Sequence, residues 1–108
     1  MYTKIKNKKI EIEELISFKQ RFKSLRFNFN KLDHIVKIPN KRVISTLFFV
    51  QYYDLVITNK NEVIIYIEES IMQDKYFVHK KGGSNFYFLP KGLIKYLKVG
   101  DIFMNYKD

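Results

Sequence analysis

One carboxylate in the middle of the chain stands out because its neighbours are apolar or aromatic. Asp54 follows Tyr52 and Tyr53 and precedes Leu55 and Val56. An ionised carboxylate is costly to bury without a hydrogen-bonding or charged partner. Asp54 therefore either accepts backbone N–H groups from a neighbouring loop and fixes the fold, or anchors a ligand hydroxyl or cation in a pocket rimmed by the two tyrosines.

The chain has two histidines, and neither has the spacing of a metal-ligand pair. His34 alternates with Leu32 and Val36, so it is either a hydrogen-bonded core histidine or a ligand. His79 is followed by two lysines, whose charges disfavour its protonation and repel a metal ion. Because a metal site needs several converging ligands, we predict no metal site and no cofactor.

Basic residues form a second candidate site. Ser17 and Gln20 make a capping-box pattern before apolar residues at helical spacing, which predicts a short amphipathic helix over Phe18–Leu25. Lysine and arginine on the outer face of such a helix can contact phosphates. The predicted polyanion surface combines this helix with a later lysine pair: Lys19, Arg21, Lys23, Arg26, Lys80 and Lys81.

The segment from Lys80 to Asn85 has the composition of a loop, with Gly82 and Gly83 between lysines and polar residues. Its backbone N–H and ammonium groups can surround a phosphate. It lacks the strand–loop–helix context and the glycine spacing of a nucleotide-binding loop. A plain hairpin connection is therefore the alternative interpretation.

The net charge of +9 is distributed unevenly along the chain. Residues 1–42 carry +8, residues 43–74 carry −4 and residues 75–108 carry +5. A basic chain with 17% aromatic residues fits nucleic-acid binding through phosphate contacts and base stacking. The same composition, rich in Lys, Asn, Ile, Tyr and Phe, also arises from an AT-rich genome, and both explanations stay open here.

Length and composition predict one soluble domain spanning residues 1–108. An apolar content of 46% is enough for a hydrophobic core. The absence of cysteine excludes disulfides, thiol catalysis and cysteine-based zinc sites. The longest apolar run, from Val43 to Ile57, contains polar residues and is shorter than a membrane span. The first fourteen residues are charged throughout, unlike a secretory signal, so we expect a cytoplasmic location.

Apolar periodicity predicts a mainly β fold. The run Leu47–Thr58 is apolar at both odd and even positions, which is typical of a central strand buried on both sides. Asn59, Lys60 and Asn61 then provide turn residues before Val63–Ile67, so these two strands should form an antiparallel hairpin. The other predicted elements are strands over 8–13, 32–38, 76–79, 86–89 and 102–106, and helices over 18–25 and 93–97.

Three segments in order resemble the uncharacterised prokaryotic family known as domain of unknown function 192. They are the basic segment Arg21–Phe27, the central hairpin Thr46–Glu62 with Asp54 at the usual acidic position, and the closing segment Leu89–Asp101. The last contains Leu-Pro-Lys-Gly, a short helix and Val-Gly-Asp. The resemblance covers about residues 17–104 and implies a compact, sandwich-like β fold without a known reaction.

The chain also departs from this family's pattern. Ser24 stands where glycine is usual, Tyr52 stands where proline is usual, and Ser45 replaces the histidine that often precedes Thr46. Many members of the family are exported, which the charged N-terminus does not match. The closing segment also resembles swapped-hairpin transcription regulators of the antitoxin type, which are about half as long and lack the central hairpin.

We therefore expect a mainly β fold: a sandwich-like or partly open barrel of about six or more mostly antiparallel strands with two short helices. Its expected function is that of a small non-enzymatic binding or accessory domain, with a ligand site formed by Asp54, Tyr52, Tyr53 and Thr46. A basic nucleic-acid-binding domain is the alternative. An enzyme of unknown class ranks third, because no Ser/His/Asp arrangement or converging carboxylate pair is present.

Overall fold

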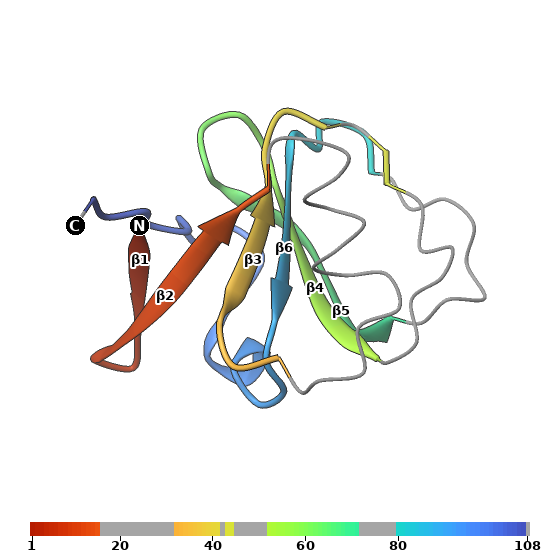
Figure 1. The fold of residues 1–108 in the computed structure, drawn as a ribbon. Coiled ribbons are helices and arrows are strands. Elements are labelled where there is room, and N and C mark those ends of the chain that lie inside the picture. Colours follow the sequence, from red (N-terminus) through yellow and green to blue (C-terminus); the bar gives the residue numbers. More distant parts are fainter. Residues whose placement is uncertain (16–31, 42, 45–51, 72–79, 108) are drawn as a thin grey trace.

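The protein forms one open, mixed β-sheet, which is seen in a computed structural model that describes residues 1–15, 32–41, 43–44, 52–71 and 80–107. The sheet has six strands in the order β1-β2-β3-β6-β4-β5 (Figure 1). The parallel pair is β2 with β3, and the other neighbouring strands are antiparallel. The strands are β1 (Tyr2–Ile5), β2 (Lys8–Glu14), β3 (Ile35–Ile38), β4 (Tyr53–Thr58), β5 (Ile64–Ile71) and β6 (Asn85–Leu89).

The mainly β prediction is confirmed, and so is the mostly antiparallel pairing. The hairpin expected around residues 59–62 is the antiparallel pair of β4 and β5. The described strands belong to a single open sheet, however, and not to the two facing sheets of a sandwich. The strand predicted over 76–79 and the start of the run Leu47–Thr58 lie outside the described residues.

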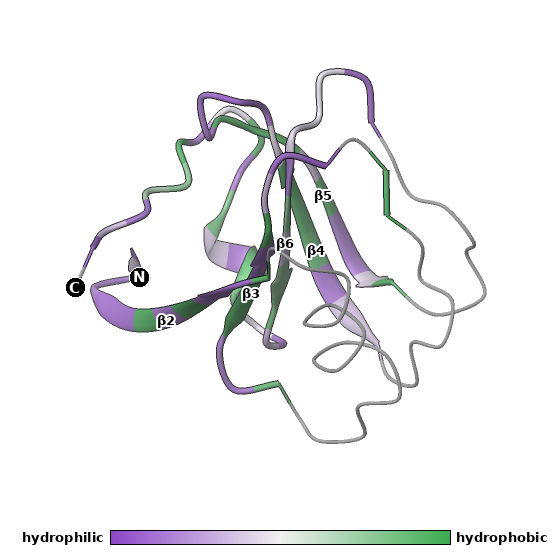
Figure 2. Cartoon of the chain, turned by 45° about the horizontal axis from the view of Figure 1, so that its top comes forward, coloured by the Kyte–Doolittle hydropathy of each residue, from purple (hydrophilic) through white to green (hydrophobic). Residues whose placement is uncertain are grey.

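Strands β4 and β6, which are neighbours in the sheet, are buried along their whole length. In their register Leu55 lies opposite Phe88 and packs into one apolar cluster, whereas Val56 lies opposite Tyr87 and packs into another. Alternate residues of one strand therefore serve two cores on opposite faces of the sheet. Figure 2 shows hydrophobic residues along β3, β4 and β6 and hydrophilic residues in the connections.

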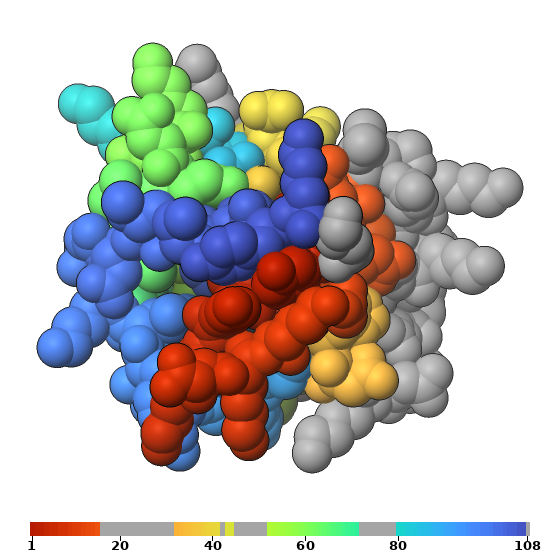
Figure 3. All heavy atoms as spheres, turned by 90° about the vertical axis from the view of Figure 1, so that its left-hand side faces the viewer, coloured from red at the N-terminus to blue at the C-terminus, as the bar shows by residue number. Residues whose placement is uncertain are grey.

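The last residues of the described chain bond to both edges of the sheet. Tyr106 exchanges backbone hydrogen bonds with Tyr2 of β1, at 2.7 and 2.9 Å. At the other edge, Phe103 donates its N–H to the carbonyl of Glu62 at 2.7 Å, and Ile102 forms an isolated bridge with Val63. The C-terminal segment and the N-terminal strands consequently lie side by side on one face of the molecule (Figure 3).

The prediction of two short helices is wrong in its C-terminal part. Leu93, Ile94 and Leu97 do pack against the second core as expected, but only Ile94–Tyr96 is helical, as one 3₁₀ turn, η1. Leu97 is already extended, with φ −116° and ψ 148°. So few residues cannot offset the cost of nucleating a longer α-helix. The helix predicted over Phe18–Leu25 lies outside the described residues.

The strand β1 has no counterpart among the predicted elements. It joins β2 through a two-residue turn in which Lys6 and Asn7 have positive φ values of 51° and 64°. This geometry suits the twist of a tight hairpin, and asparagine tolerates it well. The feature of the sequence that could have indicated this hairpin is Asn7, which lies between two short β-prone segments.

Among the described residues, the structure contains no helix that is long and apolar enough to cross a membrane.

Candidate functional site

A cluster of polar side chains surrounds the carboxylate of Glu62 at one end of the sheet. Lys37 contacts Oε2 at 2.8 Å, Thr58 donates its hydroxyl to Oε1 at 2.9 Å, and Asn85 donates its amide to Oε1 at 3.1 Å. Tyr87 donates its hydroxyl to the carboxylate at 2.8–2.9 Å, and Asn105 donates to Oε2 at 3.0 Å. We call Lys37, Thr58, Glu62, Asn85, Tyr87 and Asn105 the Glu62 cluster.

Strand register brings these donors together. Lys37 of β3 lies opposite Tyr87 of β6, and Thr58 of β4 lies opposite Asn85 of β6. Asn85 and Tyr87 are two residues apart, so they face the same side of the sheet. The donors therefore come from three adjacent strands and converge on one point.

Glu62 reaches this point because of the turn between β4 and β5. The side-chain oxygen of Asn59 accepts the N–H groups of Asn61 and Val63, at 2.9 and 3.0 Å. Glu62 closes the turn with a φ of 63°, a conformation that non-glycine residues rarely adopt. Glu62 therefore has a strained backbone conformation, and its side chain links three strands and the C-terminal segment.

Tyr87 remains a proton donor within the cluster. Burial raises the pKa of Tyr87 well above its usual range. The hydrogen bond with Asn105 acts in the opposite direction, and the charge and hydrogen bond of Glu62 raise the pKa further. The ring stacks on Phe103 at 4.1 Å, which fixes its position. The Tyr87 hydroxyl is therefore held neutral and directed at the carboxylate.

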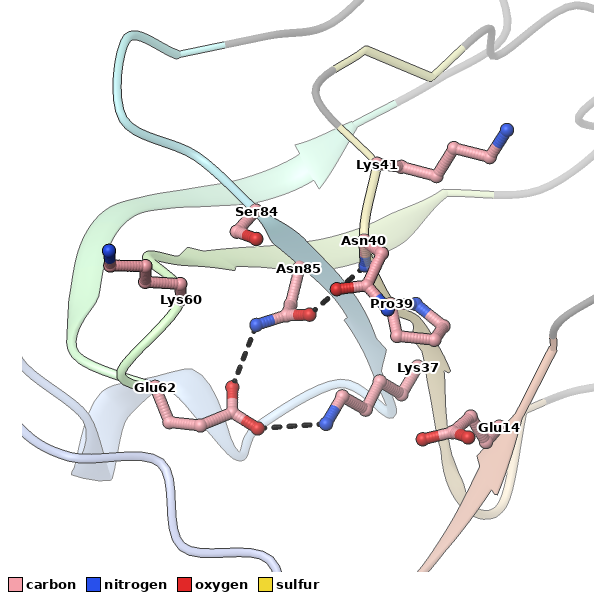
Figure 4. Close-up of a pocket in the computed structure, with 9 residues that line it drawn as sticks. All are labelled: Glu14, Lys37, Pro39, Asn40, Lys41, Lys60, Glu62, Ser84 and Asn85. Carbon is pink, nitrogen blue, oxygen red and sulfur yellow. Dashed lines mark hydrogen bonds and ion pairs between the residues drawn. The ribbon is translucent and has the colours of Figure 1, made fainter.

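A cavity of about 530 Å³ lies beside the cluster. Glu62, Lys37 and Asn85 form its inner side, and Ser84 lies next to them (Figure 4). Lys41 and Lys60 extend outward at its margins (Figure 4). We call this space the Glu62 cavity. Its volume is within the range of small-molecule sites.

A second cavity, of about 600 Å³, adjoins the first and shares Lys60 and Ser84 with it. We call it the turn cleft; its other lining residues are Asn59, Asn61, Lys80, Lys81, Gly82 and Gly83. The described residues that line the turn cleft include three lysines and no carboxylate. Unopposed ammonium groups in a concave surface make a positive potential that attracts anions.

The loop that carries Lys80 and Lys81 is held close to the sheet. The N–H of Gly83 bonds to the carbonyl of Lys80 at 2.9 Å, closing a turn in which Gly82 has φ 85°. A side-chain carbon at Gly83 would lie 2.9 Å from the Ile57 side chain and 3.0 Å from the Lys80 carbonyl. The loop therefore needs glycine at both positions, for different reasons.

Lys80 is further positioned by an aromatic ring. Its ammonium lies 4.2 Å from the ring centroid of Tyr66, a favourable cation–π distance. Tyr66 donates its hydroxyl to Glu68, and this hydrogen bond, together with partial burial, raises the pKa of Tyr66 to about 12. Tyr66 is thus neutral at physiological pH and holds Lys80 at the side of the turn cleft.

Asp54 is placed inside the sheet. Its side chain is 2% exposed, and Oδ1 accepts the backbone N–H of Ser70 at 3.0 Å. Here β5 has two residues, Glu69 and Ser70, opposite the single residue Asp54, and Ser70 has φ 57°. The carboxylate therefore satisfies a backbone group at a β-bulge, where the regular ladder is interrupted.

The described members of the predicted ligand site differ in burial. Tyr53 is buried and lies edge-on against Phe88 at 5.6 Å, whereas Tyr52 is 49% exposed. Thr46 lies outside the described residues. A ligand role for Asp54 stays a prediction, and its hydrogen bond with Ser70 supports the structural alternative.

His34 lies between two carboxylates. Nδ1 is 2.7 Å from Asp33, and Nε2 is 2.9 Å from Glu13 at the neighbouring strand β2. His34 is therefore hydrogen-bonded, as one of the two interpretations expected. It directly precedes β3 and its side chain is 34% exposed, so it lies near the surface and not in the core. Partial burial lowers its pKa, but the hydrogen bonds and charges of Asp33 and Glu13 together outweigh this and raise the pKa above its usual value.

The predicted polyanion surface is described only in part. Lys80 and Lys81 line the turn cleft, while Lys19, Arg21, Lys23 and Arg26 lie outside the described residues. Sequence reasoning did not select Glu62, Lys37 or Lys60. Two features of the sequence could have indicated this site: Lys37 is a lysine within an apolar strand, and Glu62 is an acid at the end of an asparagine-rich turn.

Comparisons with known proteins show a similar fold in two solved structures and establish no specific function. No protein-family model matches the chain, and no curated protein matches it. Among solved structures, a putative transcription regulator from Sinorhizobium meliloti superposes with a TM-score of 0.72 at 14% identity, covering 94% of this chain and 88% of that one. A protein of unknown function from Novosphingobium aromaticivorans gives a TM-score of 0.72 at 13% identity, covering 94% and 80%. These similarities establish a shared fold and no specific function.

We predict that Asp54→Ala lowers the free energy of unfolding by about 1–3 kcal/mol, because the Ser70 N–H loses its acceptor. Asp54→Asn keeps an oxygen acceptor and should cost less. Urea denaturation followed by circular dichroism measures both. Equal stability of wild type and Asp54→Ala would contradict the structural role.

We also predict that Glu62→Gln lowers the free energy of unfolding by about 2 kcal/mol or more. The change leaves the Lys37 ammonium, which is 10% exposed, without its counter-charge. Glu69→Gln on the exposed side of β5 is the matched control and should change stability by less than about 0.5 kcal/mol. Urea denaturation measures the free energy of unfolding of both variants. A similar decrease in both would contradict a stabilising role of the Glu62 cluster.

A third prediction concerns pH. Since the pKa of His34 is raised on folding, the protonated histidine stabilises the native state fully below its unfolded pKa of about 6.5, and this contribution is lost as the pH rises through the folded pKa. His34→Gln should therefore destabilise the protein more at pH 5.5 than at pH 8.5. Unfolding free energies at the two pH values test this.

The double variant Glu13→Gln/Asp33→Asn is the matched control for that experiment. It removes the charges that raise the His34 pKa and leaves burial, which lowers it, so in this background His34→Gln should no longer destabilise the protein more at pH 5.5 than at pH 8.5. A larger destabilisation at pH 5.5 that persists in this background would contradict the assignment.

Proposed function

We propose that the chain is a small non-enzymatic binding domain that holds an anionic ligand in the turn cleft and the adjoining Glu62 cavity. The observation that carries this proposal is the row of ammonium groups along the two cavities. Lys60 and Lys81 have no carboxylate partner among the described residues, and Lys80 contacts a neutral ring. Anions with several oxygens, such as phosphate groups, fit this arrangement.

The charge balance of the two cavities supports the same class of ligand. Glu62 neutralises Lys37, which leaves Lys41, Lys60, Lys80 and Lys81 against the single further carboxylate of Glu14. The Ser84 hydroxyl lies between the two cavities as an additional donor. An anion held there would contact charges from three separate segments of the chain.

A binding role is favoured over catalysis by the state of the acid–base groups. The Glu62 carboxylate already accepts hydrogen bonds from five side chains, so it has little capacity left to take a proton from a substrate. The nearby Tyr87 hydroxyl has a strongly raised pKa and is fixed as a donor to it.

Nucleic-acid binding is the second candidate function. It is favoured by the net charge of +9 and by the similarity in fold to the putative transcription regulator from Sinorhizobium meliloti. In this case the phosphates of a strand would occupy the turn cleft, with the basic segment at residues 19–26 as a further contact region. Membership of the domain of unknown function 192 family and a cytoplasmic location also belong to the proposal.

The test is a titration with inorganic pyrophosphate, monitored by NMR chemical shifts at about 50 mM salt, where screening is modest. The double variant Lys60→Gln/Lys80→Gln should bind about 100-fold more weakly, because each of the two charge-assisted hydrogen bonds contributes about 1.5 kcal/mol. Lys98→Gln/Lys107→Gln removes the same charge outside both cavities and should bind as wild type does. No binding by the wild type, or equal losses in both double variants, would contradict the proposal.

Fluorescence anisotropy with labelled mixed-sequence DNA and RNA distinguishes the second candidate. If a strand is the ligand, its affinity should fall steeply between about 50 and 200 mM salt and should fall further in Lys60→Gln/Lys80→Gln. Pyrophosphate binding without nucleic-acid binding would leave the small-anion function alone.

A further inference from the structure

A third cavity lies at the opposite end of β6 from the turn cleft. Strand β6 begins at Asn85, beside the turn cleft, and ends at Leu89. Beyond Leu89, the segment 91–96 faces the turn between β1 and β2, and these two stretches enclose about 390 Å³. The N-terminal hairpin and the segments after β6 lie side by side on this face of the molecule (Figure 3). We call this space the hairpin cleft.

The hairpin cleft is strongly positive. Lys6 and Lys8 line it from the β1–β2 turn, and Lys91 and Lys95 line it from the other side. The lining residues, all of them in the described part of the chain, include no aspartate or glutamate. Four like charges around one concave space repel one another, and a bound anion would relieve that repulsion.

An aromatic ring lies within this group of charges. Tyr96 is 40% exposed, and the ammonium groups of Lys6 and Lys95 lie 4.9 and 5.1 Å from its ring centroid. The Lys6 ammonium is also 3.5 Å from the Tyr96 hydroxyl. A partly exposed aromatic ring thus lies beside two of the four ammonium groups, which a bound anion would draw toward itself.

The base of the cleft is apolar. Ile5 is buried in the second core, and Leu93 packs against the same core while lining the cleft. The turn that carries Leu93 contains Gly92 with φ 94°, and there is open space where a side chain at Gly92 would begin. The cleft therefore combines an apolar floor, an exposed ring and four ammonium groups.

We propose that the hairpin cleft binds a nucleoside phosphate group, with the aromatic base stacked on Tyr96 and the phosphate oxygens held by the lysines. Sequence-tolerant recognition of nucleotides commonly combines base stacking on an aromatic side chain with a positively charged groove. The turn cleft offers charge, but its lining within the described part of the chain holds no aromatic ring. The two clefts therefore suit different ligands, and this inference does not depend on the function proposed for the turn cleft.

The same chemistry can come from a free nucleotide or from a single-stranded nucleic acid. In a single strand the phosphodiester charges would contact Lys6, Lys8, Lys91 and Lys95 in succession, whereas a free nucleotide would present its phosphate to fewer of them. The two sources differ in salt dependence, because each phosphate contacted on a single strand contributes about −0.7 to the slope of log K against log salt.

The test uses the full chain with three probes: adenosine 5′-monophosphate, inorganic phosphate and a fluorescein-labelled eight-nucleotide oligo(dA). Tyr96→Ala removes the stacking platform and should weaken binding of adenosine monophosphate by about 5- to 150-fold, while binding of inorganic phosphate stays unchanged. Lys91→Gln/Lys95→Gln should weaken binding of all three probes. Lys98→Gln/Lys107→Gln, outside the cleft, should behave as wild type.

The two sources then separate. Oligonucleotide binding that is tighter than nucleotide binding, with a salt slope reduced by ~1.4 in Lys91→Gln/Lys95→Gln, would identify a single strand as the ligand. Nucleotide binding without tighter oligonucleotide binding would identify the free nucleotide. Failure of the wild type to bind both nucleotide probes, or unchanged nucleotide binding in folded Tyr96→Ala, would overturn the inference, whatever pyrophosphate does at the turn cleft.

Discussion

The Glu62 carboxylate is the interaction on which the arrangement of the sheet depends. Its five donor groups come from β3, β4, β6 and the C-terminal segment, so one side chain joins elements that are far apart in the sequence. The mostly buried Lys37 ammonium and Asn85 amide would be costly without an acceptor. One carboxylate satisfies them together and fixes how the strands meet at this end. The positive φ of Glu62 is the local strain that makes this convergence possible.

Strand β6 links this constraint to both positive clefts. It is buried on both faces between β3 and β4, so its ends are among the best fixed points of the described chain. The turn cleft lies before its first residue and the hairpin cleft follows its last one. Each cleft has a glycine with positive φ in the loop beside β6: Gly82 before the strand and Gly92 after it. Each glycine allows a sharp turn, and the short loop around it carries lysines. Short loops on a rigid strand hold charged groups in place at a small entropic cost.

Local patterns predicted the central part of the fold and missed what depends on long-range contacts. The β4–β5 hairpin follows from an apolar run and an asparagine turn, both of which are read within a few residues. The 3₁₀ turn at Ile94–Tyr96 replaced a predicted helix because length, not periodicity, was limiting. The Glu62 cluster joins residues up to 68 positions apart, so no local pattern could indicate it. Asp54 was recognised as a carboxylate that needs a partner, but its partner is a bulge that only the register reveals.

The positions of four described acids help to explain why the turn cleft and the hairpin cleft are positive. Glu62 is enclosed by its donors, Asp54 is buried under Ser70, and Glu13 and Asp33 face His34. None of these four carboxylates lines the turn cleft or the hairpin cleft. The lysines of both clefts therefore have no carboxylate beside them among the described lining residues, and each cleft is a positive concavity. A composition shaped only by an AT-rich genome would enrich lysine everywhere, but it gives no reason for acids to be absent from the described lining of the turn cleft and the hairpin cleft.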